Sequence, residues 1–596
     1  MVPDDRRTRR PRQDETVIDL RQAAATRNRG ADSPEVLPTV GDTDLAAADQ
    51  ALLDAVRRHG GPALLPGLHE LGRHVGAVAQ RALAEAVEAS PPRLQAFDGR
   101  GERVDRVLTH PGWSQLQCQG TEAGLAGRPW QAAGEGHAHL ARAAGLLLWA
   151  QTSGSSAMAL STHYAAAAAL VDSPAAAQWL PRLASRRLDT GSRRAAAKPG
   201  CSAGVAVTER SSSAPGSSPA TTATRALGGP VEGGPTWRLS GRKWFAGNAD
   251  ADALLVTATT EQGTGVFLLP RRLDDGSTNG VRTQRLRPGH AYRAWVVGDL
   301  ELDAAWAVRL DSGPGASPLQ ALQAARSLDA TVLAAADARA LLSRVGHHAR
   351  HRVVPGGPLD TAPLARTLLA DLAVESEAAT VLALHLAAAT DAAHPDGGPG
   401  APGGPGTGDA AEAAALLRLA APVGAAWASR RAPQVALEAL ECLGGAGWDD
   451  DSDVARLLRD SSAVLAGATG SGLALEAVRV VADDADAVEA FVAECERSRG
   501  GHPRLDAAVT GCVDLLRTAG SEARQDLAAV QGAARWLSER LAVTLQACLV
   551  VRACPSPVAE AYLAARLDGA GTRGLGTLPL GARQTALVVD RALGDA

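Results

Sequence analysis

The stretch 436–460, ALEALECLGGAGWDDDSDVARLLRD, constrains the fold more than any other part of the chain. Apolar residues recur at helical spacing in its first half, which predicts an amphipathic helix ending at Gly444 and Gly445. Glycine at a helix end permits a positive φ and lets another group approach the backbone closely. Ser452 or Asp453 can cap a second helix. The pattern predicts either an ordinary helix–loop–helix connection or a bare backbone surface that receives another group.

Length and composition indicate a globular chain of several domains. The 596 residues are 45% hydrophobic and 21% charged, enough to bury more than one core. A net charge of −5 favours neither nucleic acid nor an anionic membrane as a general partner. Only Lys198 and Lys243 are lysines, and every other strong base is arginine.

Cysteine usage and hydropathy predict the compartment. Seven cysteines are scattered along the chain without a CxxC pair, which fits a reduced cytoplasm. No apolar run approaches the roughly 20 residues that span a bilayer. We therefore expect a cytoplasmic protein with no membrane partner.

The first half of the chain changes character near residue 190. Polar, arginine-rich residues 1–36 predict a disordered arm. Helical periodicity over 37–189 predicts an N-terminal helical domain, in which 91–113 is expected to be a connection. Short apolar or alternating runs separated by Gly, Pro and Asp over 190–305 predict an antiparallel β domain.

The second half is helical again. Residues 306–485 predict a bundle of long helices, interrupted by a Gly/Pro linker over 395–408 that cannot pack a core. Residues 486–596 predict a helical extension with an irregular tail. The expected fold class is α+β, with two helical domains flanking a β domain and a helical extension after them.

Simple metal and nucleophile motifs are weak. His347 and His351 stand at i and i+4 on a predicted helix, but no HExxH pattern or third ligand accompanies them, so we expect no metal. Ser211, Ser212 and Ser213 lie in a Ser/Pro-rich stretch with no placed histidine, which predicts a flexible loop.

The domain order and several motifs resemble the acyl-CoA dehydrogenase flavoproteins. The resemblance is nearest to the AidB-like branch, associated with the adaptive response to DNA alkylation. The motifs are LGGAGW at 443–448 with RLLRD at 456–460, SGRKWFAGNADADALLV at 240–256, DLAVESEAA at 371–379 and PPRLQAFDGRGERVDRVLTHPGW at 91–113. The resemblance implies a C-terminal four-helix bundle, FAD held between the β domain and the bundle, and a homotetramer built from dimers.

Nine positions are expected at the FAD site by this resemblance: Thr208, Trp244, Phe245, Gly247, Arg352, Gly444, Gly445, Thr469 and Gly470. Arg352 is expected to face the diphosphate, which suits a guanidinium fork. The aromatic pair is expected to back the flavin ring, with Gly247 where the family has a hydroxyl residue. The double glycine is expected against the FAD of a neighbouring subunit. The glycine-rich stretch 467–472 is either a flexible loop or a phosphate-cradling turn.

The catalytic base departs from the family pattern. Family enzymes use a glutamate to remove the α-proton of an acyl thioester. The aligned position is Gly467, and an alternative family position, next to Arg326, is Ala325. Asp329 is the nearest carboxylate on that helix and a weak substitute.

Two functions follow from the resemblance. The first is an AidB-like, FAD-binding oxidoreductase with weak or absent activity and acyl-CoA as its possible substrate. The second is a degenerate, non-catalytic paralogue that acts in binding or assembly and is linked to the DNA alkylation response. A homo-oligomer, dimer or tetramer, is expected in both cases. Strong DNA binding is not expected, because 501–596 holds ten arginines against nine acidic residues.

Overall fold

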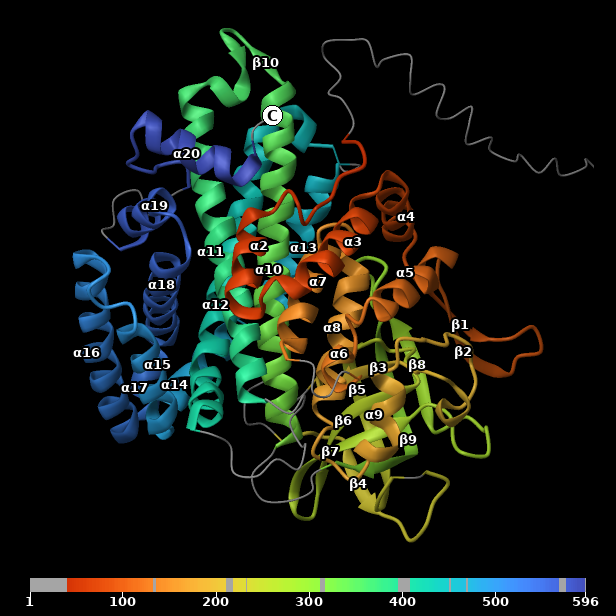
Figure 1. Cartoon of the computed structure of the whole chain (residues 1–596). Helices are drawn as coiled ribbons and strands as arrows, with labels where there is room; N and C mark the ends of the chain where they lie inside the picture. Colours follow the sequence, from red (N-terminus) through yellow and green to blue (C-terminus); the bar gives the residue numbers. More distant parts are fainter. Residues whose placement is uncertain are drawn as a thin grey trace, which may run out of the picture.

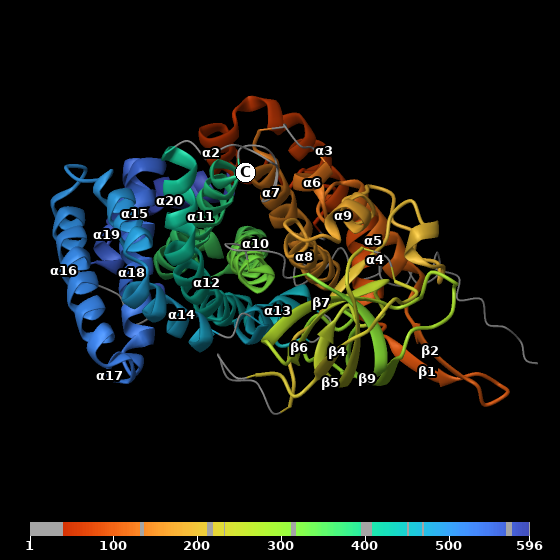
Figure 2. The ribbon, with the colours of Figure 1, turned by 90° about the horizontal axis from the view of Figure 1, so that it is seen from below.

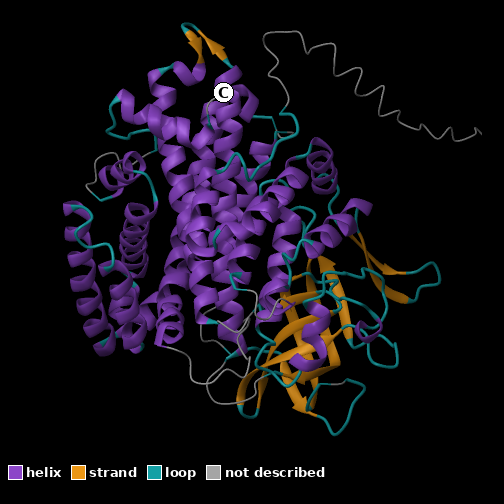
Figure 3. Cartoon of the chain, in the orientation of Figure 1, coloured by secondary structure: helices purple, strands orange, loops and turns teal. Residues whose placement is uncertain are grey.

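The computed structural model of the chain describes residues 40–131, 136–210, 218–231, 233–310, 317–394, 408–449, 452–467, 470–567 and 575–594 (Figure 1). The predicted arm 1–36, Ser211–Ser213 and nearly all of the Gly/Pro linker lie outside these residues. Figure 3 shows a large helical body beside a smaller body of strands. This arrangement confirms the expected α+β class.

The N-terminal part is helical, as predicted. Its principal helices are α2 (Gln50–Gly60), α3 (Leu65–Gly76), α4 (Val78–Glu88), α5 (Pro111–Glu122), α7 (Ala138–Ala150), α8 (Gly154–Ala168) and α9 (Ala176–Leu183). The short helices η2 (Pro62–Leu64) and α6 (Arg128–Gln131) connect them. Every residue of α7 is buried, because this helix lies between the N-terminal layer and the bundle.

The expected connection 91–113 is wrong. Its alternating residues form an antiparallel hairpin of β1 (Arg93–Phe97) and β2 (Arg103–Leu108), and α5 begins within it at Pro111. Asp98 closes the turn by accepting hydrogen bonds from two backbone N–H groups. Apolar and polar residues alternate in both strands, but the frequent charged residues made the segment resemble a connection.

The β domain is one seven-stranded sheet. Its strands are β3 (Ala203–Ala206), β4 (Thr222–Arg225), β5 (Thr236–Gly247), β6 (Ala253–Thr260), β7 (Gly263–Pro270), β8 (Val281–Leu286) and β9 (Val297–Arg309), in the order β3-β5-β4-β6-β7-β9-β8. The predicted antiparallel pairing is correct except that β6 pairs in parallel with β3 and β4. The short strands β3 and β4, and the largely polar β8, were not predicted.

The bundle surrounds α10 (Pro318–His351), which lies in the middle of the molecule when seen from below (Figure 2). The other bundle helices are α11 (Pro363–Ala393), α12 (Gly408–Leu443) and α13 (Asp453–Gly467). Both α11 and α12, together with α7, α8 and α13, contact α10. The first turns of α10 pack on the β domain, where Leu322 and Ala325 join the core around Val308.

One helix of the bundle is more apolar than the sequence analysis allowed. By length and composition, α11 could cross a membrane, so the expectation of no such stretch is wrong. Most of the apolar part of α11 is buried inside the structure, and three acidic side chains of this helix form ion pairs with arginines. These features are typical of the core helix of a bundle.

The C-terminal extension is bound to the bundle through buried ion pairs. Helix α14 (Gly470–Asp483) lies within the range expected for the bundle and packs on α12. The extension comprises α15 (Ala485–Glu496), α16 (Pro503–Gln525), α17 (Leu527–Gln531), α18 (Ala534–Ala553), α19 (Ser556–Arg566) and α20 (Ala582–Leu593). Arg566 pairs with Asp371 and Glu375 of α11, and Arg591 pairs with Glu377. Part of the predicted irregular tail is therefore helix α20, which packs on α11.

The two lysines of the chain are both buried in ion pairs. The ammonium of Lys198 donates to Asp252 at 2.6 Å and to a backbone carbonyl at 2.9 Å. Lys243 is fully buried and donates to Glu209 and to the carbonyl of Thr257. A lysine ammonium is compact and directs three donors from one point, whereas a guanidinium needs a wide planar space. Both positions therefore suit lysine better than the arginine that the chain uses elsewhere.

We predict that Lys243→Met destabilises the protein by about 3–5 kcal/mol, because Glu209 is left buried without its partner. Denaturant unfolding followed by circular dichroism measures the change. Arg242→Met is the matched control, since the neighbouring side chain is 75% exposed and should matter little. A loss below about 1 kcal/mol in Lys243→Met would contradict the assignment of this pair as a structural contact of the β domain.

Candidate functional site

Strand β5 presents two aromatic side chains at a β-bulge. Trp244 and Phe245 lie opposite the single residue Asp299 of β9. Phe245 has a φ of 51°, in the left-handed region that aromatic residues rarely adopt, and is 51% exposed. A bulge that turns an aromatic side chain outward at a cost in backbone strain is typical of a binding surface. We call these two residues the aromatic wall.

Asp299 organises the aromatic wall. Its carboxylate accepts hydrogen bonds from the backbone N–H of Phe245 at 3.4 Å and from Arg285 at 2.7 Å. Arg287 donates to both carboxylate oxygens, at 2.8 and 2.9 Å. Burial raises the pKa of Asp299, but the hydrogen bonds from Arg287 and Arg285 outweigh burial and hold that pKa below its usual value. The carboxylate is therefore ionised at neutral pH and fixes both guanidinium groups.

Gly247 lies beneath an indole ring that the sequence analysis did not identify. A Cβ atom at this position would lie 2.6 Å from the ring of Trp295. The Trp295 indole donates to the Asn248 side chain at 2.8 Å, and that side chain donates to backbone carbonyls of α8 and β3. The space of the expected hydroxyl residue is thus filled by an aromatic ring.

Thr208, one of the expected FAD residues, lies beside the aromatic wall together with the adjacent Glu209. The carbonyl of Thr208 accepts the backbone N–H of Trp244 at 2.8 Å. Glu209 accepts from Lys243 and from the hydroxyl of Thr221. Thr208 and Glu209 therefore hold the strand that carries the aromatic wall.

Arg352, Gly444 and Gly445 lie at the other end of the bundle. Arg352 is exposed and follows the last residue of α10, where the small hairpin of β10 (Val353–Val354) and β11 (Gly357–Pro358) begins. Gly444 has a φ of 56° at the end of α12, and neither glycine has an atom within 4 Å of an added Cβ. The ion pair of Arg344 with Asp453 holds the start of α13 beside α10. Figure 1 shows β10 at the end of the bundle that is far from the seven-stranded sheet.

Within a single copy of the chain, the expected FAD residues therefore do not lie together. The wall residues and Gly247 belong to the β domain, whereas Arg352 and the double glycine belong to the distant end of the bundle (Figure 1). Gly470 is buried at the first residue of α14, and Thr469 lies outside the described residues.

The substitute base Asp329 is held in an ion pair. It is 1% exposed, and Arg142 donates to its two oxygens at 2.5 and 2.8 Å. The Arg142 guanidinium also stacks on the ring of Tyr164, 3.5 Å from the centroid. A carboxylate bound on both oxygens cannot accept a substrate proton without breaking this pair, so the geometry favours a structural role. Gly467 is the last residue of α13.

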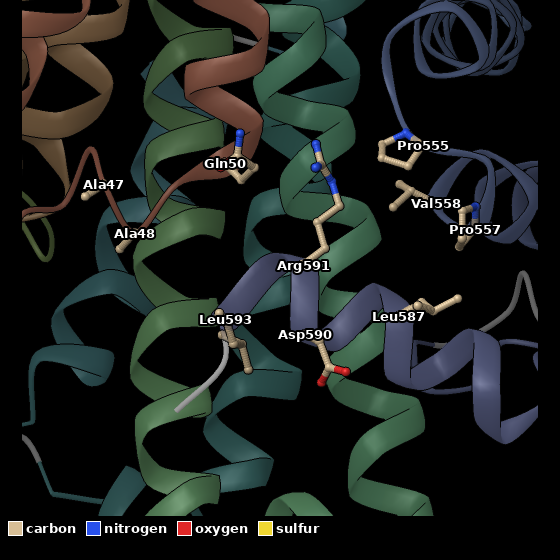
Figure 4. A pocket seen from close by; sticks show the side chains of 11 residues that line it. Ala47, Ala48, Gln50, Pro555, Pro557, Val558, Leu587, Asp590, Arg591 and Leu593 are labelled. Atoms are coloured by element: carbon tan, nitrogen blue, oxygen red, sulfur yellow. The ribbon is translucent and has the colours of Figure 1, made fainter.

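The cavity shown in Figure 4 lies elsewhere. It has a volume of about 520 Å³ and is formed by residues before and within α2 together with α19 and α20, including Gln50, Val558 and Arg591. Arg591 is engaged by Glu377 and Asp54. Volume alone makes this cavity a candidate site, but no predicted site residue lines it, and the strained aromatic wall is the better supported candidate.

Potential metal ligands are not clustered in the part of the chain that the structure describes, where no three His, Cys, Asp or Glu side chains could hold an ion together. The rings of His347 and His351 lie 4.4 Å apart, and His351 contacts the carbonyl of His347 through Nδ1 at 2.8 Å.

Four charged side chains lie close together in the interior: Glu88 of α4, Asp337 of α10, and Asp460 and Arg456 of α13. Asp337 is 4% exposed, and its Oδ2 has no hydrogen-bond partner. Burial raises the pKa of Asp337 well above its usual value, and the nearby Asp460 adds to this rise. Burial also raises the pKa of Asp460 to about 6 against the opposing charge of Arg456, with Glu88 contributing to the rise.

Comparison with known proteins identifies the scaffold. Residues 36–190 match the adaptive response protein AidB N-terminal domain, and residues 318–471 match the acyl-CoA dehydrogenase C-terminal domain. The chain is 28% identical over 495 residues to the putative acyl-CoA dehydrogenase AidB of Escherichia coli (strain K12), covering 82% of this chain and 87% of that protein.

Solved structures share the fold. Caenorhabditis elegans ACDH-11 in complex with C11-CoA has a TM-score of 0.75 and 21% identity, covering 94% of this chain and 92% of that one. An acyl-CoA dehydrogenase from Bacillus anthracis complexed with FAD has a TM-score of 0.58 and 17% identity, covering 81% and 80%. The class is that of the acyl-CoA dehydrogenase flavoproteins. Within this class, the chain carries the AidB N-terminal domain and is similar to AidB over most of its length.

We predict that Asp337→Asn stabilises the protein at pH 8 and has little effect near pH 4. Folding raises this pKa above the unfolded value near 4, so the wild type loses stability as pH rises through and above that value. The amide is neutral at every pH and avoids this loss. The gain at pH 8 reflects the upward shift of this pKa on folding, so it should be larger than any change measured near pH 4.

Urea unfolding at pH 4 and pH 8 tests this prediction. Asp514→Asn is the control, because its carboxylate is 65% exposed in a surface pair with Arg517. Equal pH dependence in wild type and Asp337→Asn would show that the carboxyl group is not forced into its neutral form.

Proposed function

We propose that this chain is an FAD-binding protein of the acyl-CoA dehydrogenase type in which acyl-CoA dehydrogenation is weak or absent. The missing base carries the proposal. The reaction requires a group that accepts the α-proton of the thioester. Position 467 is glycine, and Asp329 is already bound on both oxygens by Arg142.

The described residues fit FAD in two separate halves. The half-exposed ring of Phe245 offers a face to a flat ring system, and the open backbone at Gly444 and Gly445 admits close approach. The exposed Arg352 suits a diphosphate, because a guanidinium binds phosphate oxygens in a bidentate manner. When bound, FAD supplies a hydride acceptor.

The separation of these halves supports a homo-oligomer. The aromatic wall of one copy and the Arg352 end of a second copy would together complete one site. In such a site Trp244 and Phe245 orient the ring system, and Arg352 binds the diphosphate. The α-proton of a bound thioester has no carboxylate to receive it.

Acyl-CoA is the proposed ligand class. The neighbour ACDH-11 was solved in complex with C11-CoA, and its fold covers nearly all of this chain. A chain that binds a thioester without removing its proton can act as a binding or assembly protein. This is the second candidate, and the same missing base favours it. A role in the DNA alkylation response belongs to this candidate.

Several arginines of the extension face inward, which supports our expectation of no strong DNA binding. Arg552 pairs with Glu494, Arg566 with two acids of α11, and Arg591 with Glu377. These side chains do not neutralise phosphates.

A cytoplasmic location is supported by the seven cysteines, all of which are free.

We predict negligible bleaching of the flavin when acyl-CoA thioesters are added anaerobically to the FAD-loaded wild type. Loss of a positioned base typically costs about 10²–10⁴-fold in rate. Gly467→Glu should recover part of that rate. A panel of chain lengths, with wild type and variant side by side, measures it by flavin absorbance. Rapid bleaching by the wild type would show that another group serves as base.

We predict that Arg352→Ala weakens FAD binding by about 10- to 100-fold, because a charge-assisted contact contributes roughly 1.5–3 kcal/mol. Titration of the apoprotein with FAD, followed by flavin fluorescence, gives the affinity. Arg517→Ala is the control, since this side chain is 73% exposed on the extension. An unchanged FAD affinity in Arg352→Ala would remove this residue from the site.

A further inference from the structure

Arg287 occupies the angle between the two rings of the aromatic wall. Its guanidinium carbon lies 4.1 Å from the centroid of Phe245 and 4.6 Å from that of Trp244. The two rings stand nearly perpendicular, at 75°. A guanidinium at these distances is held by cation–π attraction to both faces. Any flat ligand that binds at this wall therefore meets a cation beside it.

The position of Arg287 is fixed by two further contacts. Asp299 binds the guanidinium through both oxygens, and the backbone N–H of Arg287 donates to the carbonyl of Val297 at 2.8 Å. The side chain is only 20% exposed. A bidentate pair on a buried carboxylate restricts the rotamers of an arginine. The ligand must therefore adapt to Arg287, because the arginine is not free to move aside.

The local charge is positive. Arg285 and Arg287 share the one carboxylate of Asp299, which leaves a net charge of +1. Arg210 adds a second cation, 5.6 Å from the centroid of Trp244. In a partly buried site a fixed charge acts more strongly than in water. The wall therefore favours a flat ring that carries, or can acquire, a negative charge.

We propose that Arg287 is a cofactor-contact residue that makes the aromatic wall bind two-electron-reduced FAD more tightly than oxidised FAD. The inference rests on the proposed function, since it assumes that the wall receives a flavin. The reduced ring system readily carries a negative charge at neutral pH, whereas the oxidised ring system is neutral. The fixed guanidinium distinguishes the two forms by this charge. Asp299 is the positioning residue that holds Arg287 in place.

The test is to measure the affinity of the full-length apoprotein for oxidised and for dithionite-reduced FAD under anaerobic conditions. In Arg287→Met, affinity for reduced FAD should fall by roughly 10- to 100-fold, and affinity for oxidised FAD by clearly less. Arg287→Lys keeps the charge but loses the fork, so it should retain part of the preference. Arg282→Met is the matched control, because this residue of β8 forms an exposed pair with Asp303.

The outcomes separate the two proposals. Equal losses for both forms of FAD, or no loss in Arg287→Met, would overturn the assignment of Arg287 while leaving FAD binding intact. A wild type that binds neither form would overturn the proposed function, and the inference with it. If Arg287→Met unfolds, as judged by circular dichroism, the comparison of Arg287→Lys with wild type decides. A preference for reduced FAD that is smaller in Arg287→Lys than in wild type supports the contact, and a preference that is unchanged, or absent from both proteins, overturns it.

Discussion

Arginine–carboxylate pairs buried between layers join the parts of this protein. Arg142 of α7 and Asp329 of α10 form such a pair, each 1% exposed, where the N-terminal helices meet the bundle. Arg566 and Arg591 do the same between the extension and α11. Replacing a buried pair by apolar residues is often neutral, but removing one partner is strongly destabilising. These pairs therefore specify how the layers dock more than they add to the total stability.

The same chemistry is used locally at the aromatic wall. One carboxylate, Asp299, fixes the backbone of Phe245 and the side chains of two arginines. The strained φ of Phe245 persists because these contacts over-determine its position. An aromatic surface without such support would collapse against the sheet. The aromatic wall is thus held in place by Asp299, whose carboxylate is engaged by protein groups.

Under the proposed function, residues that hold the backbone and the residue that would remove a proton are affected differently. Contacts that hold the backbone survive: Glu209 binds Lys243, and the double glycine keeps its open surface. The carboxylate that would act only during proton removal is absent at position 467. This combination fits the proposed function.

The sequence by itself determined the α+β class and most of the long helices. These depend on periodicity, glycine placement and motif identity, which are local properties. It missed the hairpin of β1 and β2, the strands β3, β4 and β8, and helix α20, because short or charged elements are specified by their neighbours.

Only the tertiary structure decided the surroundings of the predicted site residues. It placed Asp329 in an ion pair 187 positions from its partner and put the ring of Trp295 over Gly247. It also identified Arg287 and Asp299, which carry no motif. Asp299 is one of three acidic residues that alternate along β9, with Glu301 and Asp303, so the strand pattern did not single it out. Contacts between residues distant in sequence depend on how layers pack, and no local pattern encodes that.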